Sequence, residues 1–149
     1  MVGCSSVVDN DDDVVERVKT GDHVPLFSVT VVDGDEEYSF STSQLTGETV
    51  IVFFNTWCSD CQRELPKLNQ YYLQHKNDKG FQMVAISRGE GKELVADFWQ
   101  ANNLQIPYSA QEDRRIYDLF ASSVIPRVYF CSKEGIVTRI FIEVLPDTF

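Results

Sequence analysis

The chain has 149 residues, a formal net charge of −10 and a hydrophobic fraction of 43%. This length suits one domain with one ordinary core, and the negative charge disfavours nucleic acid and anionic lipid surfaces as partners. The four cysteines are too sparse for a disulfide-stapled mini-fold, so we expect a hydrophobic core to supply the stability.

Residues 1–20 are predicted to form a flexible acidic tether. They contain the acidic run at residues 9–13 and few side chains that could pack. Before that run, Cys4 follows a small residue, which is typical of the end of a bacterial lipoprotein signal. We therefore expect a lipid anchor at Cys4, with a chance cysteine in a mobile terminus as the alternative.

Residues 21–149 are predicted to form the folded domain, and a β-hairpin opens it. Residues 27–32 and 38–40 alternate between apolar and polar side chains, with Asp33-Gly34-Asp35 as the turn between them. The next apolar run, residues 50–54, is rich in β-branched and aromatic side chains and predicts a buried strand.

A pair of cysteines, Cys58 and Cys61, follows this strand at the point where a helix is expected to begin. Their spacing lets the two sulfurs meet across one helical turn. The unpaired amides and the positive dipole end at the helix start favour a thiolate at the first cysteine. This layout predicts Cys58 as a nucleophile and Cys61 as the thiol that resolves its adducts.

The helix that carries the cysteines is expected to continue to about residue 76. Apolar and aromatic residues recur along it at helical spacing, and Gly80 marks its end. Pro66 lies inside this stretch and has no amide hydrogen to donate, so we expect a bend just after the first turn.

Strands and helices alternate through the rest of the chain. The predicted elements are a strand at 81–87, a helix at 93–102, a short helix at 116–120, and strands at 128–131 and 137–142. The helix at 93–102 is expected to turn Leu94, Phe98 and Trp99 toward the core. The order of elements predicts an α/β sandwich, with a mixed central sheet flanked by helices.

Three segments together resemble a known family. They are Trp57-Cys58-Ser59-Asp60-Cys61, Glu64-Leu65-Pro66, and Val124-Ile125-Pro126 ahead of a late strand. In this combination the chain resembles the thioredoxin superfamily, and within it the TlpA/ResA-like extracytoplasmic thiol–disulfide oxidoreductases of bacteria. The resemblance covers residues 21–142 and implies a thioredoxin-like domain.

The resemblance also implies how the site works. Ile125–Pro126 would be a cis peptide bond that faces the cysteines and offers backbone groups to a substrate chain. Trp57 would shield one side of the pair, with an ordinary core aromatic as the alternative. No cofactor is implied. The implied partners are proteins with a disulfide or dithiol, and an upstream redox partner, on the periplasmic side of the membrane.

The chain departs from the thioredoxin pattern near the cysteines. Val52 stands where thioredoxins place a buried acid, so Glu64, Asp60 or water is expected to accept the proton of Cys61. Asn55 replaces a small apolar residue, and either hydrogen-bonds near the site or caps the strand.

A further departure is the chain end, which stops at Phe149 where the last helix of the family would begin. We therefore expect one sheet face to be thinly covered, with apolar side chains at Ile140, Ile142 and Val144. Because large apolar patches seldom stay bare, self-association or a rearranged tail should cover that face.

Asp60 stands where thioredoxins have a proline between the cysteines. Its charge would oppose a thiolate on Cys58, which makes the reduced form less stable. We therefore expect a reductant with a potential nearer that of thioredoxin than that of DsbA, provided that Arg63 or Arg127 does not cancel the charge.

The predicted function is the reduction of disulfides in partner proteins, through a mixed disulfide on Cys58 that Cys61 resolves. One alternative is a thiol peroxidase of the same fold, although neither cysteine has the threonine three residues before it that such a site requires. The other is a zinc-binding structural module. Only His23, His75 and Cys131 are obvious additional ligands, without ligand spacing, and Cys131 is expected to be a buried small hydrophobe.

Overall fold

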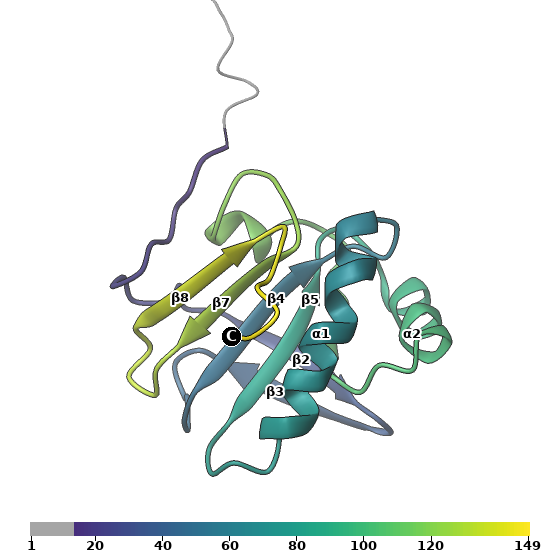
Figure 1. The fold of residues 1–149 in the computed structure, drawn as a ribbon, viewed down its shortest axis with the longest axis horizontal. Coiled ribbons are helices and arrows are strands. Elements are labelled where there is room, and N and C mark those ends of the chain that lie inside the picture. The colour runs from purple at the N-terminus through teal and green to yellow at the C-terminus, as the bar shows by residue number, and fades with distance from the viewer. Residues whose placement is uncertain (1–13) are drawn as a thin grey trace, which may run out of the picture.

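The computed structural model describes residues 14–149, which form one seven-stranded sheet flanked by helices (Figure 1). The elements in chain order are β2 (Ser28–Asp33), β3 (Glu36–Ser41), β4 (Thr49–Phe54), α1 (Ser59–His75), β5 (Gln82–Ser87), α2 (Lys92–Ala101), β6 (Tyr108–Ser109), the 3₁₀ helix η2 (Tyr117–Leu119), β7 (Arg127–Cys131) and β8 (Val137–Ile142). The strand order is β3-β2-β6-β5-β4-β7-β8. The predicted mixed α/β fold with an N-terminal hairpin is confirmed.

Strand β4 lies inside the sheet, between β5 and β7, and leads directly to the cysteines. All six of its residues are buried, since β5 pairs with it in parallel and β7 in antiparallel fashion. A strand covered on both faces gains most from a continuous apolar run, which is what residues 50–54 provide.

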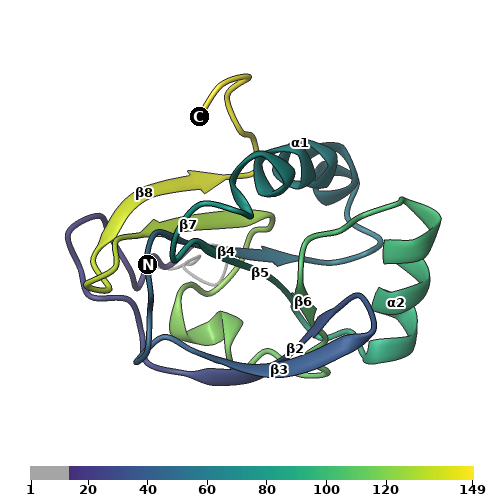
Figure 2. The ribbon, with the colours of Figure 1, turned by 90° about the horizontal axis from the view of Figure 1, so that it is seen from below.

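Helices α1 and α2 cover the same face of the sheet. Phe54 contacts Trp99 of α2, with ring centroids 4.9 Å apart, and Phe130 contacts Tyr71 of α1 at 5.5 Å. Val50 pairs with Phe130 and lies four residues before Phe54, so period-two alternation puts these side chains on one face. Figure 2 shows α1 on one side of the sheet, with α2 farther along, toward β6.

The opposite face is covered by the segment around η2. Phe53 of β4 contacts Tyr117 and Phe120 there, at centroid distances of 5.5 and 4.8 Å. Figure 2 shows this short helix, in green, on the side of the sheet away from α1. The predicted short helix is therefore present, and its aromatic side chains form part of the core.

The second helix differs from the prediction in which side chains it buries. Val95 and Trp99 are buried, whereas Leu94 is 60% exposed and Phe98 is only partly buried. Positions four apart share a helix face, and Leu94 lies about 100° around the helix from Val95. The expectation that Leu94 faces the core was wrong.

The chain after β8 forms no helix and instead lies on the α1 face of the sheet, beside that helix. Leu145 is buried, and the Phe149 ring stacks on Tyr71 with centroids 5.2 Å apart. Of the two expected ways to cover this face, the structure shows the rearranged tail. Ile142 and Val144 stay exposed.

The chain before β2 packs on the η2 face. Val18 is buried, and Glu16 forms an isolated β-bridge with Ala121. Of the expected tether, residues 1–13 and with them Cys4 lie outside the described residues, while residues 14–20 contact the domain. Within the described range, no helix is long and apolar enough to cross a membrane.

Candidate active site

The cysteine pair lies between the end of β4 and the first turn of α1, at the upper edge of the sheet in Figure 1. Cys58 is the N-cap of α1, and its sulfur accepts a hydrogen bond from the Cys61 amide at 3.3 Å. The sulfur therefore satisfies one of the amides that a helix leaves unpaired at its start. This arrangement is the one that the Cys-x-x-Cys spacing predicted.

The two thiols have different surroundings. Cys58 is partly exposed, whereas Cys61 is fully buried. Burial raises the pKa of Cys61 well above its ordinary value, and a hydrogen bond with Cys58 raises it further. Cys61 is thus a protonated thiol while Cys58 is the sulfur that an incoming molecule can reach.

The loop ahead of β7 faces this pair. Ile125–Pro126 is a cis peptide bond, as the resemblance implied, and the Ile125 carbonyl oxygen lies 3.9 Å from the Cys58 sulfur. Both residues are buried. A backbone carbonyl is thereby fixed next to the reactive sulfur.

The side chain of Trp57 lies at the surface beside the pair, with 69% of it exposed, so it is not a core aromatic. Asn55 is buried, and its amide nitrogen is oriented to donate to the carbonyls of Phe54 and Arg88. In that orientation its oxygen accepts from the Trp57 indole nitrogen at 3.2 Å. Of the two expectations for Asn55, a hydrogen bond near the site is the one observed.

The two carboxylates expected to affect the pair are both bound by Arg63. Its guanidinium lies 2.8 Å from Asp60 and 2.5 Å from Glu64. The expectation that Asp60 opposes a thiolate on Cys58 assumed that no arginine cancels its charge. Arg63 pairs with Asp60 and offsets that charge, so the assumption does not hold. Arg127, the other cation considered, pairs with Glu16 instead.

Glu64 is buried and binds the C-terminal tail. Its carboxylate accepts from the Leu145 amide at 2.9 Å and lies 3.3 Å from the Lys67 ammonium. Burial raises the pKa of Glu64, but these contacts and Arg63 outweigh it and hold the pKa below its usual range. In the described residues no hydrogen bond joins Glu64 or Asp60 to Cys61.

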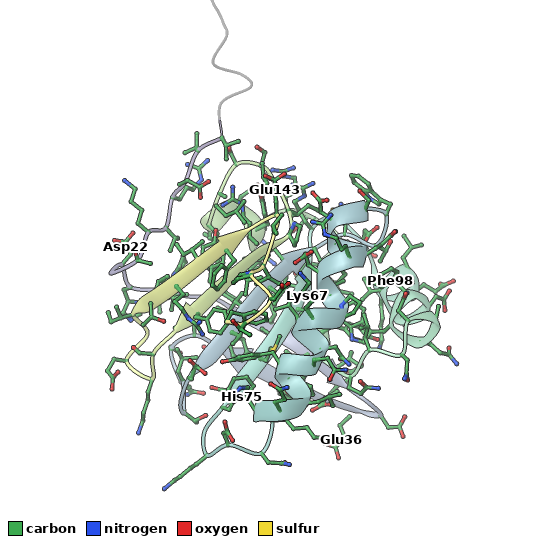
Figure 3. All side chains as sticks on the ribbon, in the orientation of Figure 1. Asp22, Glu36, Lys67, His75, Phe98 and Glu143 are labelled. Atoms are coloured by element: carbon green, nitrogen blue, oxygen red, sulfur yellow. The ribbon has the colours of Figure 1, made fainter. Side chains whose placement is uncertain are left out.

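Figure 3 shows Lys67 on α1 and Glu143 where β8 ends, on the side where the tail runs. The Glu143 amide donates to the Pro126 carbonyl at 2.9 Å, and its own carbonyl accepts from Arg63. The tail thus joins the cis-proline loop to the first turns of α1.

Glu90, a buried acid at the site, was not among the residues predicted from the sequence. Its two carboxylate oxygens accept from the amide and the hydroxyl of Thr56, both at 2.7 Å. Thr56 precedes Trp57, so this carboxylate fixes the turn that leads into the pair. One signal existed: Glu90 lies between two glycines just after β5, and the carboxyl ends of parallel strands meet at one edge of a sheet.

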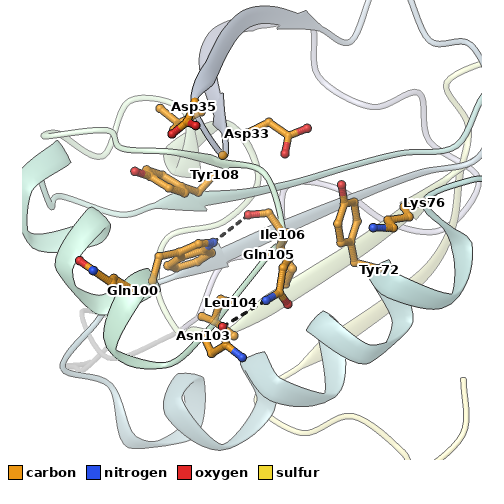
Figure 4. A pocket seen from close by; sticks show the side chains of 13 residues that line it. Asp33, Asp35, Tyr72, Lys76, Gln100, Asn103, Leu104, Gln105, Ile106 and Tyr108 are labelled. Atoms are coloured by element: carbon orange, nitrogen blue, oxygen red, sulfur yellow. Dashed lines mark hydrogen bonds between the residues drawn. The ribbon is translucent and has the colours of Figure 1, made fainter.

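A separate hollow of about 620 Å³ lies at the other end of α1, between the β2–β3 turn, α1 and the chain after α2 (Figure 4). Trp99 lies in its wall and donates to the Ile106 carbonyl at 2.7 Å. None of the cysteines in residues 14–149 lines this hollow.

The remaining expected ligands do not gather near the cysteines. Cys131 is buried in β7, and burial raises its pKa to about 12, as befits a small hydrophobe. His23 contacts the Val24 carbonyl and His75 contacts Asp78. Within residues 14–149 no three histidine, cysteine or acidic side chains form a group that could hold a metal ion.

A Cys-x-x-Cys pair at a helix start, opposite a cis-proline loop and on a mixed sheet, defines a thioredoxin-like protein. Residues 20–140 match the AhpC/TSA family, and the chain belongs to that family. It is 33% identical over 135 residues to the thiol-disulfide oxidoreductase ResA of Oceanobacillus iheyensis, covering 87% of this chain and 67% of that protein. It is 29% identical over 127 residues to ResA of Bacillus subtilis, covering 84% and 68%.

Solved structures share the fold. A putative protein disulfide isomerase from Bacteroides thetaiotaomicron superposes with a TM-score of 0.79 at 24% identity, covering 87% of this chain and 82% of that chain. StoA from Bacillus subtilis superposes at 0.64 and 22% identity, covering 79% and 87%. Because the chain has the Cys58–Cys61 pair at the helix start and its relatives are named thiol-disulfide oxidoreductases, it is a thiol–disulfide oxidoreductase.

Proposed function

We propose that this protein reduces disulfides in partner proteins, with Cys58 as the attacking sulfur and Cys61 as the resolving one. The observation that carries this assignment is the asymmetry of the pair. Cys58 is partly exposed at the helix start and faces the Ile125 carbonyl, whereas Cys61 is fully buried behind it. Only the outer sulfur can meet a disulfide on another chain.

The exchange runs in two displacements. The Cys58 thiolate attacks one sulfur of the partner disulfide, forms a mixed disulfide and expels the other sulfur as a thiolate, which takes a proton from water. Cys61 then loses its proton and attacks the Cys58 sulfur, which releases the second partner thiolate. Two electrons have moved to the partner, and Cys58 and Cys61 are joined as a disulfide. An upstream dithiol must return them to the reduced state.

The surroundings of Cys61 support this order of events. After burial, the hydrogen bond and charge of Cys58 contribute to the raised pKa of Cys61, while a hydrogen bond from the Asn55 backbone and the Arg88 charge lower that pKa. Once Cys58 is in a mixed disulfide, its contribution is gone. The resolving thiol therefore ionises more readily when a partner is attached than before.

Trp57, Ile125 and Pro126 are the residues proposed to contact the partner chain. Trp57 offers an exposed indole beside the pair, and the Ile125 carbonyl lies next to the Cys58 sulfur. An extended substrate segment can pair with such a backbone group while its disulfide sulfur approaches Cys58.

We also propose an extracytoplasmic location with a lipid anchor at Cys4. The segment Val2-Gly3-Cys4-Ser5-Ser6 and the resemblance to TlpA/ResA-like oxidoreductases support it. Expression of the full gene with labelled palmitate should label the protein, and a Cys4→Ala variant should stay unlabelled. An unlabelled wild-type protein would exclude the anchor.

The roles of the two cysteines are tested by trapping. In Cys61→Ser, mixed disulfides with partner proteins should accumulate on Cys58 and be visible as adducts on non-reducing gels. Cys58→Ser and the double variant provide the matched controls and should trap nothing. Equal trapping by Cys58→Ser would reverse the assignment.

A further inference from the structure

The residue that follows the cis-proline is a fully buried arginine. Arg127 donates from Nη2 to the Ser123 carbonyl at 2.7 Å and from Nε to the Val124 carbonyl at 2.9 Å. Its two terminal nitrogens also bind both carboxylate oxygens of Glu16, at 2.6 and 2.9 Å. One guanidinium therefore joins the loop ahead of the cis-proline to a residue 111 positions earlier in the chain.

Glu16 lies in a segment that is itself tied to this loop. We call residues 14–18 the N-terminal strap. The Val15 amide donates to the Ser122 hydroxyl at 2.8 Å, the Ser122 amide donates to the Val15 carbonyl at 3.1 Å, and the Arg17 amide donates to the Phe120 carbonyl at 3.0 Å. The strap thus follows the chain that leads into the cis-proline loop.

The loop adopts a backbone conformation that needs outside support. Val124 has a φ of 80°, a region that β-branched residues rarely adopt. Its carbonyl is held by Arg127 and by the Tyr117 hydroxyl, the latter at 2.7 Å. The next residue is Ile125, whose carbonyl faces Cys58.

The buried cation depends on the strap for its counter-charge. Burial lowers the pKa of Arg127, but the hydrogen bonds to Glu16 and contacts with Tyr129 and Tyr117 outweigh it and raise the pKa above its ordinary value. No other carboxylate lies within salt-bridge distance of Arg127 in residues 14–149. Without Glu16 the guanidinium is a buried, unpaired charge, and the loop must open to let water reach it.

We propose that Glu16 and Arg127 are positioning residues of the active site, through which the N-terminal strap holds residues 123–126 in the form that receives a substrate chain. This inference rests on the proposed function, because it assumes that the Ile125 carbonyl contacts the partner protein. The strap is then part of the redox site, although it precedes the cysteines by some forty residues.

The inference separates two kinds of substrate. A protein disulfide needs both the Cys58 sulfur and the loop, whereas a small disulfide needs only the sulfur. Loosening the loop should therefore raise KM for a protein substrate while the reaction of Cys58 with a small disulfide stays the same. A general loss of folding would instead expose the buried thiols of Cys61 and Cys131 and raise the rate with the small disulfide.

The experiment compares Glu16→Gln with wild type on insulin, as the protein disulfide, and on 5,5′-dithiobis(2-nitrobenzoate), as the small one. Insulin reduction should lose about tenfold in kcat/KM, mostly through KM, and the small-disulfide rate should stay within about twofold. Glu16→Asp, which keeps the charge, should recover part of the loss. Equal losses on both substrates, or none on either, would overturn the proposal.

The matched control is Asp22→Asn, which also removes one negative charge from the chain before β2. In residues 14–149 the Asp22 carboxylate accepts only from the Lys19 amide, and Asp22 lies at the sheet edge away from α1 (Figure 3). Both substrate rates should stay at the wild-type level.

If the wild-type protein itself does not reduce insulin, the proposed function fails, and hydrogen exchange then tests the inference separately. Faster exchange of residues 120–127 in Glu16→Gln, with α1 unchanged, supports it, and unchanged exchange rejects it.

Discussion

Two segments near the ends of the described chain pass beside the active site, and a buried charge holds each of them. On the α1 face, the carboxylate of Glu64 binds the Leu145 amide of the tail. On the η2 face, the guanidinium of Arg127 binds Glu16 of the N-terminal strap. The cis-proline loop lies between them, since the Glu143 amide also donates to the Pro126 carbonyl.

The two anchors differ in how they are satisfied. The Glu64 carboxylate pairs with two partly exposed cations and accepts a hydrogen bond from one backbone amide, so several partners stabilise this buried anion. Arg127 has one carboxylate, and its other acceptors are uncharged: the Ser123 and Val124 carbonyls and two tyrosine hydroxyls. Losing one partner should therefore disturb the tail a little and the loop a lot, because only the loop's cation has a single counter-charge.

The largest expected effect comes from removing the cation of the loop. Arg127→Ala should lower the free energy of unfolding by about 3–5 kcal/mol, because it leaves a cavity, removes the donors of the Ser123 carbonyl and leaves the Val124 carbonyl with the Tyr117 hydroxyl alone. Urea unfolding measures the loss. A change below about 1 kcal/mol would show that water or a neighbour replaces the guanidinium at little cost.

A smaller effect is expected at the tail. Glu64→Gln keeps an acceptor for the Leu145 amide but removes the charge that Arg63 and Lys67 share, so we expect a loss of about 1–2 kcal/mol at neutral pH. The pH dependence of this loss shows whether the charge of Glu64 causes it. Because the pKa of Glu64 is lowered in the fold, its contribution is fully present above the ordinary carboxyl value of about 4.3 and is lost as the pH falls through the lowered one.

Urea unfolding of both proteins between about pH 3 and pH 7 should therefore show the gap between wild type and Glu64→Gln closing as the solution becomes acidic. A gap that stays constant across this range would assign the loss to packing. Hydrogen exchange of the tail amides provides the local measurement, since they should exchange faster in the variant.

The smallest effect is expected at Asp60. Its carboxylate is partly exposed and already paired with Arg63, so Asp60→Asn should move the redox potential of the cysteine pair by less than about 10 mV. Equilibration with a glutathione buffer measures the potential. A shift of about 30 mV or more would restore Asp60 as a determinant of the potential, despite its ion pair.

Much of the fold could be predicted because its signals are local. The apolar run of β4, the alternation of β2 and β3 and the spacing of Cys58 and Cys61 each lie within a few residues. Leu94 was misplaced because its helix is short, and only the packing against β4 decides which neighbouring apolar residue is buried. Whether Trp57 is exposed could not be predicted either, because that also depends on which parts of the chain pack around it.

The cysteine pair, the strand and helix that hold it and the late proline could all be predicted, because each depends on the chemistry of adjacent residues. Their surroundings could not, because they are made by residues far apart in the chain. Glu16 lies 111 residues from Arg127, Leu145 lies 81 residues from Glu64, and Glu90 lies 34 residues from Thr56. A charged residue in sequence reads as a surface residue, and it becomes a buried anchor only when the fold brings its partner to it.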